Sequence, residues 1–239
     1  MTQEQEYFYR HTTLILDNTK ETFVDFLDFY LQQQGKTLQQ FIEQHQHFIY
    51  HLCYNKYPCC QCPPHTRPHT KGSRVIHLPQ LDILLDKHGG KLPNHNPGSP
   101  SAPHCCSPVN PGLTLEKLDI TLLRVLLVNF VPLGSAERKA VEDLTAIRNE
   151  SFAHARQACM TDGEFKTSVT RIQQSLLVLA NVSGRQTSTL EKFNKVCQLP
   201  VSLHLFHQLQ ATLLQEANLY EKIQESLHEF HTKMKRVRI

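Results

Sequence analysis

Apolar side chains recur with the period of an amphipathic helix through most of the chain. Between residues 20 and 33, Phe23, Phe26, Leu27 and Tyr30 are separated by steps of three, one and three. Five further segments carry comparable spacing and are predicted to be helices: 6–17, 37–52, 114–130, 135–159 and 164–182. The pattern therefore predicts an all-α fold.

Polar and small residues indicate where these helices begin and end. The triplet at 17–19 has turn and N-cap chemistry, so two separate helices are expected at the start of the chain. Thr37 and Thr114 are the predicted N-caps of the third and fourth helices, and Ser135 opens the next one. The Ser-Gly pair at 183–184 is predicted to end the last of them.

The segment 54–113 breaks the helical pattern. It holds eleven of the thirteen prolines, six of the fifteen histidines and five of the eight cysteines. Proline at this density excludes a long helix. Only residues 74–89 have a locally ordered pattern, which predicts a strand followed by a short helix. We expect an insertion between the third and fourth helices.

Beyond Pro200 the pattern predicts one long helix. Its apolar positions follow alternating steps of three and four residues, interrupted at Glu216: Phe206, Leu209, Leu213, Tyr220, Ile223, Leu227, Phe230 and Met234. This seam fits either packing on the preceding domain or a self-associating coiled coil. The basic end, KMKRVRI, carries too few charges to indicate a nucleic-acid site. We divide the chain into a helical domain at 1–184 and a heptad-helix extension at 185–239.

Composition predicts a soluble protein with one sizeable core. Forty per cent of the residues are apolar, and the net charge of +3 does not by itself imply nucleic acid. The start of the chain lacks the basic-then-apolar pattern of a secretory signal, and Arg124 and Asn129 interrupt the longest apolar run. We expect an intracellular protein, cytoplasmic rather than nuclear, with no membrane association.

Cysteines and histidines cluster at the two edges of the insertion. Their uneven placement in an intracellular chain favours reduced thiols or metal over disulfides. Because zinc takes four thiolate or imidazole ligands in a tetrahedron, two clusters joined by a loop predict one structural zinc site. The candidate ligands are Cys59, Cys60, Cys62, His104, Cys105 and Cys106.

The choice of four ligands among these six stays open. Adjacent cysteines do not easily face one ion, so Cys60 and Cys62 form one favoured pair. The spacing departs from the common C-x-x-C knuckle. The second pair is Cys106 with either His104 or Cys105. Free thiols in a flexible loop are the alternative. A catalytic zinc is less favoured, because no carboxylate is placed nearby as a general base.

The stretch AIRNESFAHA at 146–155 places polar groups on an otherwise apolar helix. Arg148 falls inside the arc that Leu144 and Ile147 define. His154 lies roughly 120 degrees away and about 9 Å along the axis, so the two side chains could converge on one small anion. On spacing alone the alternative is ordinary packing, in which Arg148 covers the core with its stem and pairs with a carboxylate.

The string R-N-E-S-F-A-H resembles the signature of the HEPN superfamily, an arginine followed by a polar residue and then a histidine. The resemblance extends to YFYRHTTLILDNTKETFVDFL, the CCQC stretch and LDITLLRVLLVNF. These occur in the same order in HEPN domains similar to that of the DAZ-interacting zinc-finger ubiquitin ligase. The resemblance covers residues 6–183 and leaves out the C-terminal helix.

This resemblance implies a helical bundle that forms a homodimer with two Arg/His motifs facing each other. Many HEPN domains are metal-independent endoribonucleases, whereas others bind RNA or serve as interaction modules. Carried over to this chain, His154 would be the general acid or base and Arg148 would stabilise transition-state charge. Asn149 would orient the pair.

The combined prediction is an all-α, HEPN-like helical bundle with a Cys/His-rich zinc-binding insertion and a long C-terminal helix. Its leading function is recognition of single-stranded RNA by a homodimer, with metal-independent cleavage as the activity to be tested. The alternative is a non-catalytic protein-interaction or oligomerisation module in a signalling or innate-immune assembly. The near-neutral charge slightly favours the alternative, and the R-N…H string favours RNA.

Overall fold

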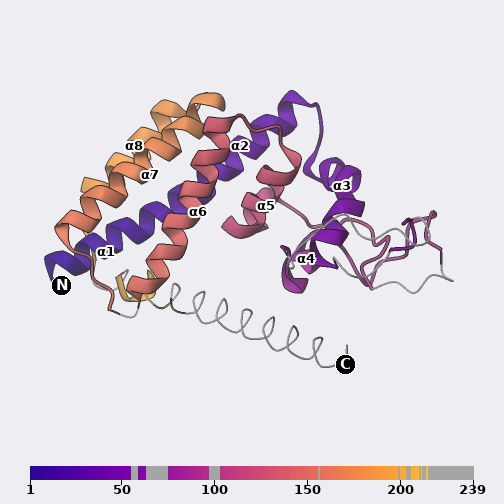
Figure 1. Cartoon of the computed structure of the whole chain (residues 1–239), viewed down its shortest axis with the longest axis horizontal. Coiled ribbons are helices and arrows are strands. Elements are labelled where there is room, and N and C mark those ends of the chain that lie inside the picture. Colours follow the sequence, from indigo (N-terminus) through magenta and orange to yellow (C-terminus); the bar gives the residue numbers. More distant parts are fainter. Residues whose placement is uncertain are drawn as a thin grey trace, which may run out of the picture.

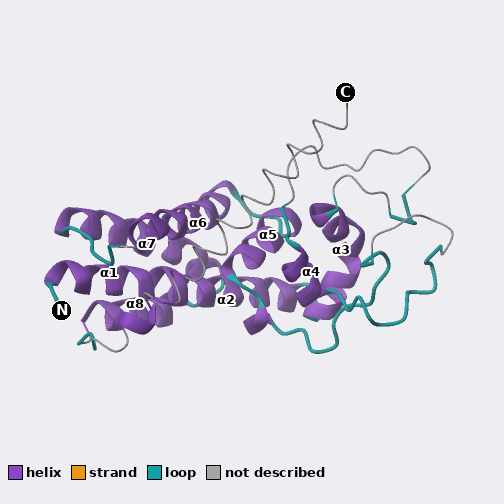
Figure 2. Ribbon diagram, turned by 90° about the horizontal axis from the view of Figure 1, so that it is seen from below, coloured by secondary structure: helices purple, strands orange, loops and turns teal. Residues whose placement is uncertain are grey.

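The computed structural model contains eight α-helices and no strand among the residues that it describes, so the predicted all-α fold is confirmed (Figure 2). No described helix combines the length and the apolar character that a bilayer span requires. The side chains of residues 152–155 are outside the description. The described residues are 1–54, 59–62, 75–96, 103–155, 157–198, 200–202, 206–209, 211 and 214.

The chain begins with one long helical rod. Helix α1 (Gln3–Thr13) continues through a π-helical segment (Leu14–Asn18) directly into α2 (Thr19–Gln33) (Figure 1). The predicted break between two helices is therefore wrong, since Asn18 keeps helical dihedrals and makes no side-chain cap. The π-helical segment is almost wholly buried, with Ile15 fully so. Core packing overrides the local cap preference. The π-helical turn is wider than an α-helical turn, so it shifts which residues of the rod face the core.

Four later helices complete the bundle. Helices α6 (Ser135–Ala155), α7 (Asp162–Val182) and α8 (Gln186–Gln198) lie along the α1–α2 rod, and α5 (Ile120–Phe130) packs against α2 and α6 (Figure 1). The predicted apolar arcs face inward. Almost wholly buried side chains from these arcs include Leu27, Leu122, Leu126, Leu144, Ile147, Ile172, Leu176 and Leu179.

Capping interactions set the start of two helices. Helix α3 (Leu38–Cys53) begins as predicted at Thr37, which forms a capping box with Gln40. Helix α7 begins slightly before its predicted start, because Thr161 and Glu164 form the same kind of reciprocal cap. These side-chain bonds satisfy backbone N–H groups that the first helical turn leaves without an intrahelical partner.

The predicted start of the fourth helix at Thr114 is wrong. Thr114 precedes a short 3₁₀ turn (Leu115–Lys117), and α5 begins after Asp119. The Asp119 carboxylate accepts a hydrogen bond of 2.7 Å from the backbone N–H of Leu122. Leu118 is fully buried in an extended conformation between the two elements. The chain therefore turns inward at Leu118 before the helix can start.

Helix α8 was not predicted from the sequence, and it packs on the bundle. Phe193 is 4% exposed. The Arg10 guanidinium of α1 donates a hydrogen bond of 2.6 Å to the carbonyl oxygen of Val196. Further along, Phe206 meets Phe8 at a ring-centroid distance of 6.3 Å, edge to face. The chain after α8 thus returns to the bundle at Phe206.

The predicted heptad helix beyond Pro200 lies largely outside the described residues. Phe206 is buried and Leu209 is partly buried against the core. The other predicted seam positions, and with them the coiled-coil interpretation, fall on residues that the structure does not describe.

The described part of the insertion at 54–113 adds apolar side chains to the edge of the core. It contains α4 (Leu78–Leu84) and lies beside α3, at the opposite end of the molecule from α8 (Figure 1). The predicted strand before α4 is wrong for the described residues, since residues 75–77 form no strand. After α4, an isolated β-bridge joins Leu85 to Val109. Fully or almost fully buried side chains of the insertion are Ile76, Leu81, Leu84, Leu85 and Val109.

Candidate functional site

Helix α3 places two histidines on one face, next to the insertion. His47 and His51 are four residues apart, so their side chains lie one helical turn above each other. Ile49 and Leu52 on another face of the helix are buried and hold α3 in place. The rigid helix therefore presents two imidazoles in a fixed relation.

Two cysteines of the insertion meet these histidines. Cys59 Sγ lies 3.3 Å from His47 Nδ1, and Cys62 Sγ lies 3.1 Å from His51 Nε2. The two sulfur atoms are 3.5 Å apart. A backbone hydrogen bond of 3.1 Å from the Cys62 N–H to the Cys59 carbonyl closes the turn that carries both thiols. We call these four residues the first Cys/His group.

Four other residues form the second Cys/His group, namely Cys60, His95, Cys105 and Cys106. Cys60 Sγ lies 3.2 Å from Cys106 Sγ and 3.5 Å from Cys105 Sγ. His95 Nδ1 lies 3.4 Å from Cys60 Sγ. The two groups share no residue, although Cys60 lies in the turn between Cys59 and Cys62.

Each group has the dimensions of a four-coordinate metal site. The ligand atoms within each group lie within 4.8 Å of one another, and the groups could hold metal ions. In a tetrahedral site with Zn–S near 2.3 Å and Zn–N near 2.0 Å, neighbouring ligand atoms are about 3.3–3.8 Å apart. The measured separations within both groups fall close to that range. None of the eight cysteines is in a disulfide.

The thiols of these groups are in unequal environments. Burial raises the pKa of Cys59 to about 12 and raises the pKa of Cys106 even further. Burial would also raise the pKa of Cys60, but a backbone hydrogen bond at Asn96 and bonds to the neighbouring thiols outweigh it and lower that pKa. A raised pKa keeps a thiol protonated, so a bound cation would be needed to bring Cys59 and Cys106 into the thiolate form that binds metal.

The structure places His104 outside both groups. Its Nε2 lies 2.7 Å from an Asp82 carboxylate oxygen, and its Nδ1 lies 3.1 Å from the Tyr54 hydroxyl. Burial alone would raise the pKa of Asp82, but the hydrogen bonds from His104 and Lys87 outweigh it and lower that pKa. With both ring nitrogens in these contacts, His104 connects its loop to α4 through Asp82 and to the end of α3 through Tyr54.

The other five predicted ligands all enter a group, and the three histidines were missed. The spacing of His47 and His51 on a helix is a ligand signal that sequence reasoning passed over. Cys59 and Cys62 form a C-x-x-C pair, which the additional Cys60 concealed. His95 carries no comparable sequence signal, because only the fold brings it to Cys60.

The structure separates the two described residues of the predicted catalytic motif. Arg148 is half-buried, and its Nη1 lies 3.4 Å from the Thr121 hydroxyl of α5. Asn149 is exposed. His154 belongs to α6, but its side chain is outside the described atoms. The Arg148 side chain thus reaches from α6 to α5.

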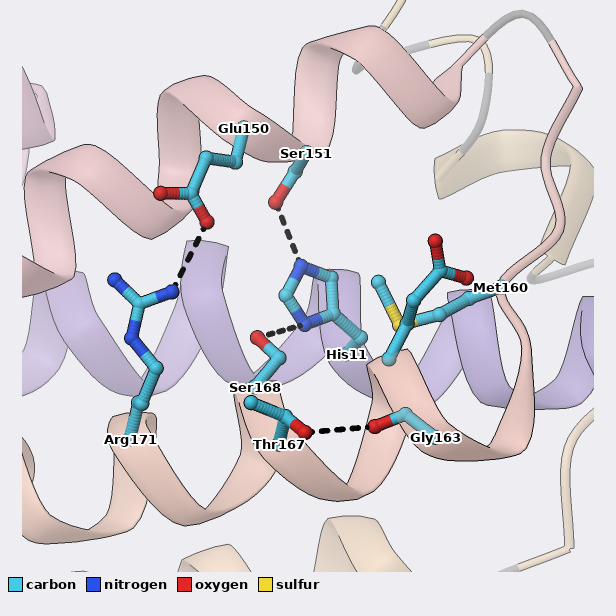
Figure 3. A pocket seen from close by; sticks show the side chains of 9 residues that line it. His11, Glu150, Ser151, Met160, Gly163, Thr167, Ser168 and Arg171 are labelled. Carbon is cyan, nitrogen blue, oxygen red and sulfur yellow. Dashed lines mark hydrogen bonds and ion pairs between the residues drawn. The ribbon is translucent and has the colours of Figure 1, made fainter.

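A polar pocket of about 400 Å³ lies beside the same helix, between α1, α6 and α7 (Figure 3). The buried His11 ring forms its floor, with Nε2 at 2.7 Å from the Ser151 hydroxyl and Nδ1 at 3.0 Å from the Ser168 hydroxyl. An ion pair of 3.1 Å between Arg171 and Glu150 lies at its edge. The remaining lining residues are Met160, Gly163, Glu164 and Thr167.

Fold and site together define the class of the protein. It is an all-α helical bundle with an insertion in which two Cys/His groups could hold metal ions. No protein family, curated protein or solved structure matched the chain in comparison. Membership of the HEPN superfamily is accordingly a proposal that depends on the sequence motifs alone.

Proposed function

We propose that this protein is a non-catalytic recognition module, a helical bundle whose insertion is held to α3 by structural zinc. The observation that carries the proposal is the first Cys/His group, which joins two histidines of α3 to a C-x-x-C turn of the insertion. Mixed imidazole and thiolate ligands in a tetrahedron favour zinc among the common divalent metals.

The ligand set supports a structural role for the metal. Two imidazoles and two thiolates complete a tetrahedron, whereas a catalytic zinc keeps one position open for water or substrate. The ligand atoms also join segments that are separated in sequence, as structural zinc sites do. A metal in this group would fix the direction in which the insertion leaves α3.

Exposed apolar side chains support protein recognition at this end of the molecule. Of the large apolar residues that are exposed among the described ones, Phe48 lies on α3 and Val75 and Leu78 lie in the insertion. Each is between 37% and 38% exposed. The two other exposed large apolar residues among the described ones, Met1 and Val182, lie outside α3 and the insertion.

The metal proposal is tested by elemental analysis of protein purified without chelator. Wild type is expected to contain stoichiometric zinc, and His51→Ala is expected to lose at least one equivalent. His88→Ala is the matched control, because His88 is an exposed histidine of the insertion outside both groups. Absence of zinc from a well-folded wild type would refute the structural role.

RNA recognition by a HEPN-like homodimer, with metal-independent cleavage, is the second candidate function. The polar pocket beside α6 favours it, since Glu150 and Ser151 of the R-N-E-S-F-A-H string line that pocket. In this candidate Arg148 stabilises the transition state, Asn149 orients the catalytic pair and His154 transfers the proton. The half-buried Arg148 lies against Thr121 while Asn149 is exposed, and this difference favours the non-catalytic proposal.

A nuclease assay in EDTA separates the two candidates. The non-catalytic proposal expects no cleavage of pooled single-stranded RNA. Cleavage that falls by about a hundredfold or more in Arg148→Ala and in His154→Ala would favour the ribonuclease instead. Arg185→Ala, at an exposed position between α7 and α8, is the charge-matched control. Oligomeric state, measured on the same samples, reports whether a dimer is present.

A further inference from the structure

We propose that Cys60, His95, Cys105 and Cys106 hold a second zinc ion, separate from the ion of the first Cys/His group. We further propose that loading of this second site depends on the first. The existence of the second site is independent of the proposed function. The order of loading rests on the proposed function, because that order presupposes a metal in the first group.

The positions of the four ligand atoms carry the first step of the argument. The three sulfur atoms form a triangle with sides of 3.2, 3.5 and 3.9 Å, and His95 Nδ1 closes it at 3.4 Å from Cys60 Sγ. The ligand atoms of three separate segments therefore meet at one point. Three thiolates and one imidazole are a complete zinc ligand set.

The backbone at Cys106 explains how two adjacent cysteines reach one point. Cys106 has a φ of +52°, in the left-handed region that non-glycine residues rarely occupy. Neighbouring side chains on an extended chain point in opposite directions, and the left-handed residue turns them to the same side. This conformation is strained for an L-residue. Strain of this kind concentrates at ligand clamps, so it supports a binding role for the turn.

Hydrogen-bond donors are directed at the sulfur atoms. The Cys60 backbone N–H donates to Cys105 Sγ at 3.3 Å, and the Gln61 side-chain amide donates to Cys106 Sγ at 3.4 Å. N–H donors stabilise a thiolate more than a thiol, because the thiolate carries the negative charge. Lys91 adds a positive charge to the same loop, where its Nζ donates to the Ser107 hydroxyl at 3.0 Å.

The backbone also fixes His95 and the thiol-bearing loop relative to each other. The Leu92 N–H donates to the Cys106 carbonyl at 2.9 Å, and the His95 N–H donates to the Leu92 carbonyl at 2.9 Å. The Gln46 side chain of α3 donates to the Ser107 carbonyl. The second group is therefore built on a bonded framework next to α3.

The turn 59–62 couples the two groups. Cys59 and Cys62 face the histidines of α3, and Cys60 between them faces the second group. A metal in the first group would fix both ends of this turn and thereby hold Cys60 in place. Since His47 and His51 stand on a preformed helix, the first group needs less ordering before it binds metal. Zinc is thus expected to occupy the first group before the second.

Metal content in single variants tests the proposal. Wild type is expected to contain two zinc ions per chain, and Cys106→Ser and His95→Ala one each. His51→Ala is expected to lose the first ion and to bind the second at least tenfold more weakly. Cys197→Ser, at a half-buried cysteine outside both groups, is the matched control and should keep both ions. Circular dichroism on each sample establishes that the bundle is folded.

Other outcomes would overturn the proposal in identifiable ways. One ion in wild type, lost in His51→Ala and kept in Cys106→Ser, would leave the first site standing and refute the second. A mass two units below the reduced value, abolished by Cys106→Ser, would show a disulfide in place of the second ion. Full zinc affinity at the second site in His51→Ala would refute the order of loading. No zinc in wild type would refute both sites.

Discussion

A strong chelator is expected to free the insertion from α3 and leave the helical bundle folded. In the proposed arrangement the metal-bound turn 59–62 connects α3 to the loops that carry His95 and Cys106. The apparent binding free energy of structural zinc in small domains is about 10–16 kcal/mol, so its removal outweighs most single contacts. None of the Cys/His ligands belongs to α1, α2 or α5–α8, so these helices are expected to stay folded without the metal.

Hydrogen exchange followed by mass spectrometry measures this effect segment by segment. Amide protection in 75–96 and 103–113 is expected to fall by about a hundredfold on chelation, and that in α6 and α7 by less than threefold. The buried side chains of Leu81 and Leu84 are expected to retain part of the local order. Re-addition of zinc should restore protection. Unchanged protection in the insertion would contradict the expectation, and so would unfolding of the whole chain.

Replacing His11 with alanine is expected to lower the free energy of unfolding by about 2–4 kcal/mol. His11 is 2% exposed, and its ring joins Ser151 of α6 to Ser168 of α7. The Ser151 hydroxyl donates to the Ile147 carbonyl, so its oxygen accepts from His11 Nε2–H. Nδ1 then accepts from Ser168. Alanine would remove both bonds and leave a cavity between three helices.

Chemical denaturation monitored by circular dichroism gives the size of this loss. The exposed His88→Ala is the control and should change the free energy of unfolding by less than about 0.5 kcal/mol. His11→Gln, which keeps one donor and one acceptor, is expected to recover part of the loss. A loss below about 0.5 kcal/mol for His11→Ala would show that the bridge contributes little to the bundle.

Helical periodicity predicted the all-α fold and most inward faces, because an amphipathic arc is a local property of the sequence. Local rules failed where burial decided the outcome. The turn chemistry at 17–19 gave way to a π-helical segment, since Ile15 and its neighbours lie in the core. The helix start at Thr114 gave way to Asp119 because Leu118 had to be buried first.

The candidate metal ligands show the same difference between what local sequence patterns predict and what the tertiary structure decides. Five cysteines in two clusters were enough to predict that the insertion could hold a metal, because thiols crowded in this way are typical of metal ligands. One site was expected, whereas the structure forms two Cys/His groups. His104 was a reasonable candidate by position, but its contacts with Asp82 and Tyr54 direct both ring nitrogens away from the thiols.

The sequence by itself determined the helical class of this protein, the place of the insertion and the chemical character of its thiols, since each depends on spacing or composition. Only the tertiary structure decided which thiol joins which imidazole. Cys59 and Cys60 are neighbours in the chain and enter different groups, and His95 meets Cys60 from 35 residues away. Which side chains enter each Cys/His group depends on where several segments meet in space, and only the folded chain determines where they meet.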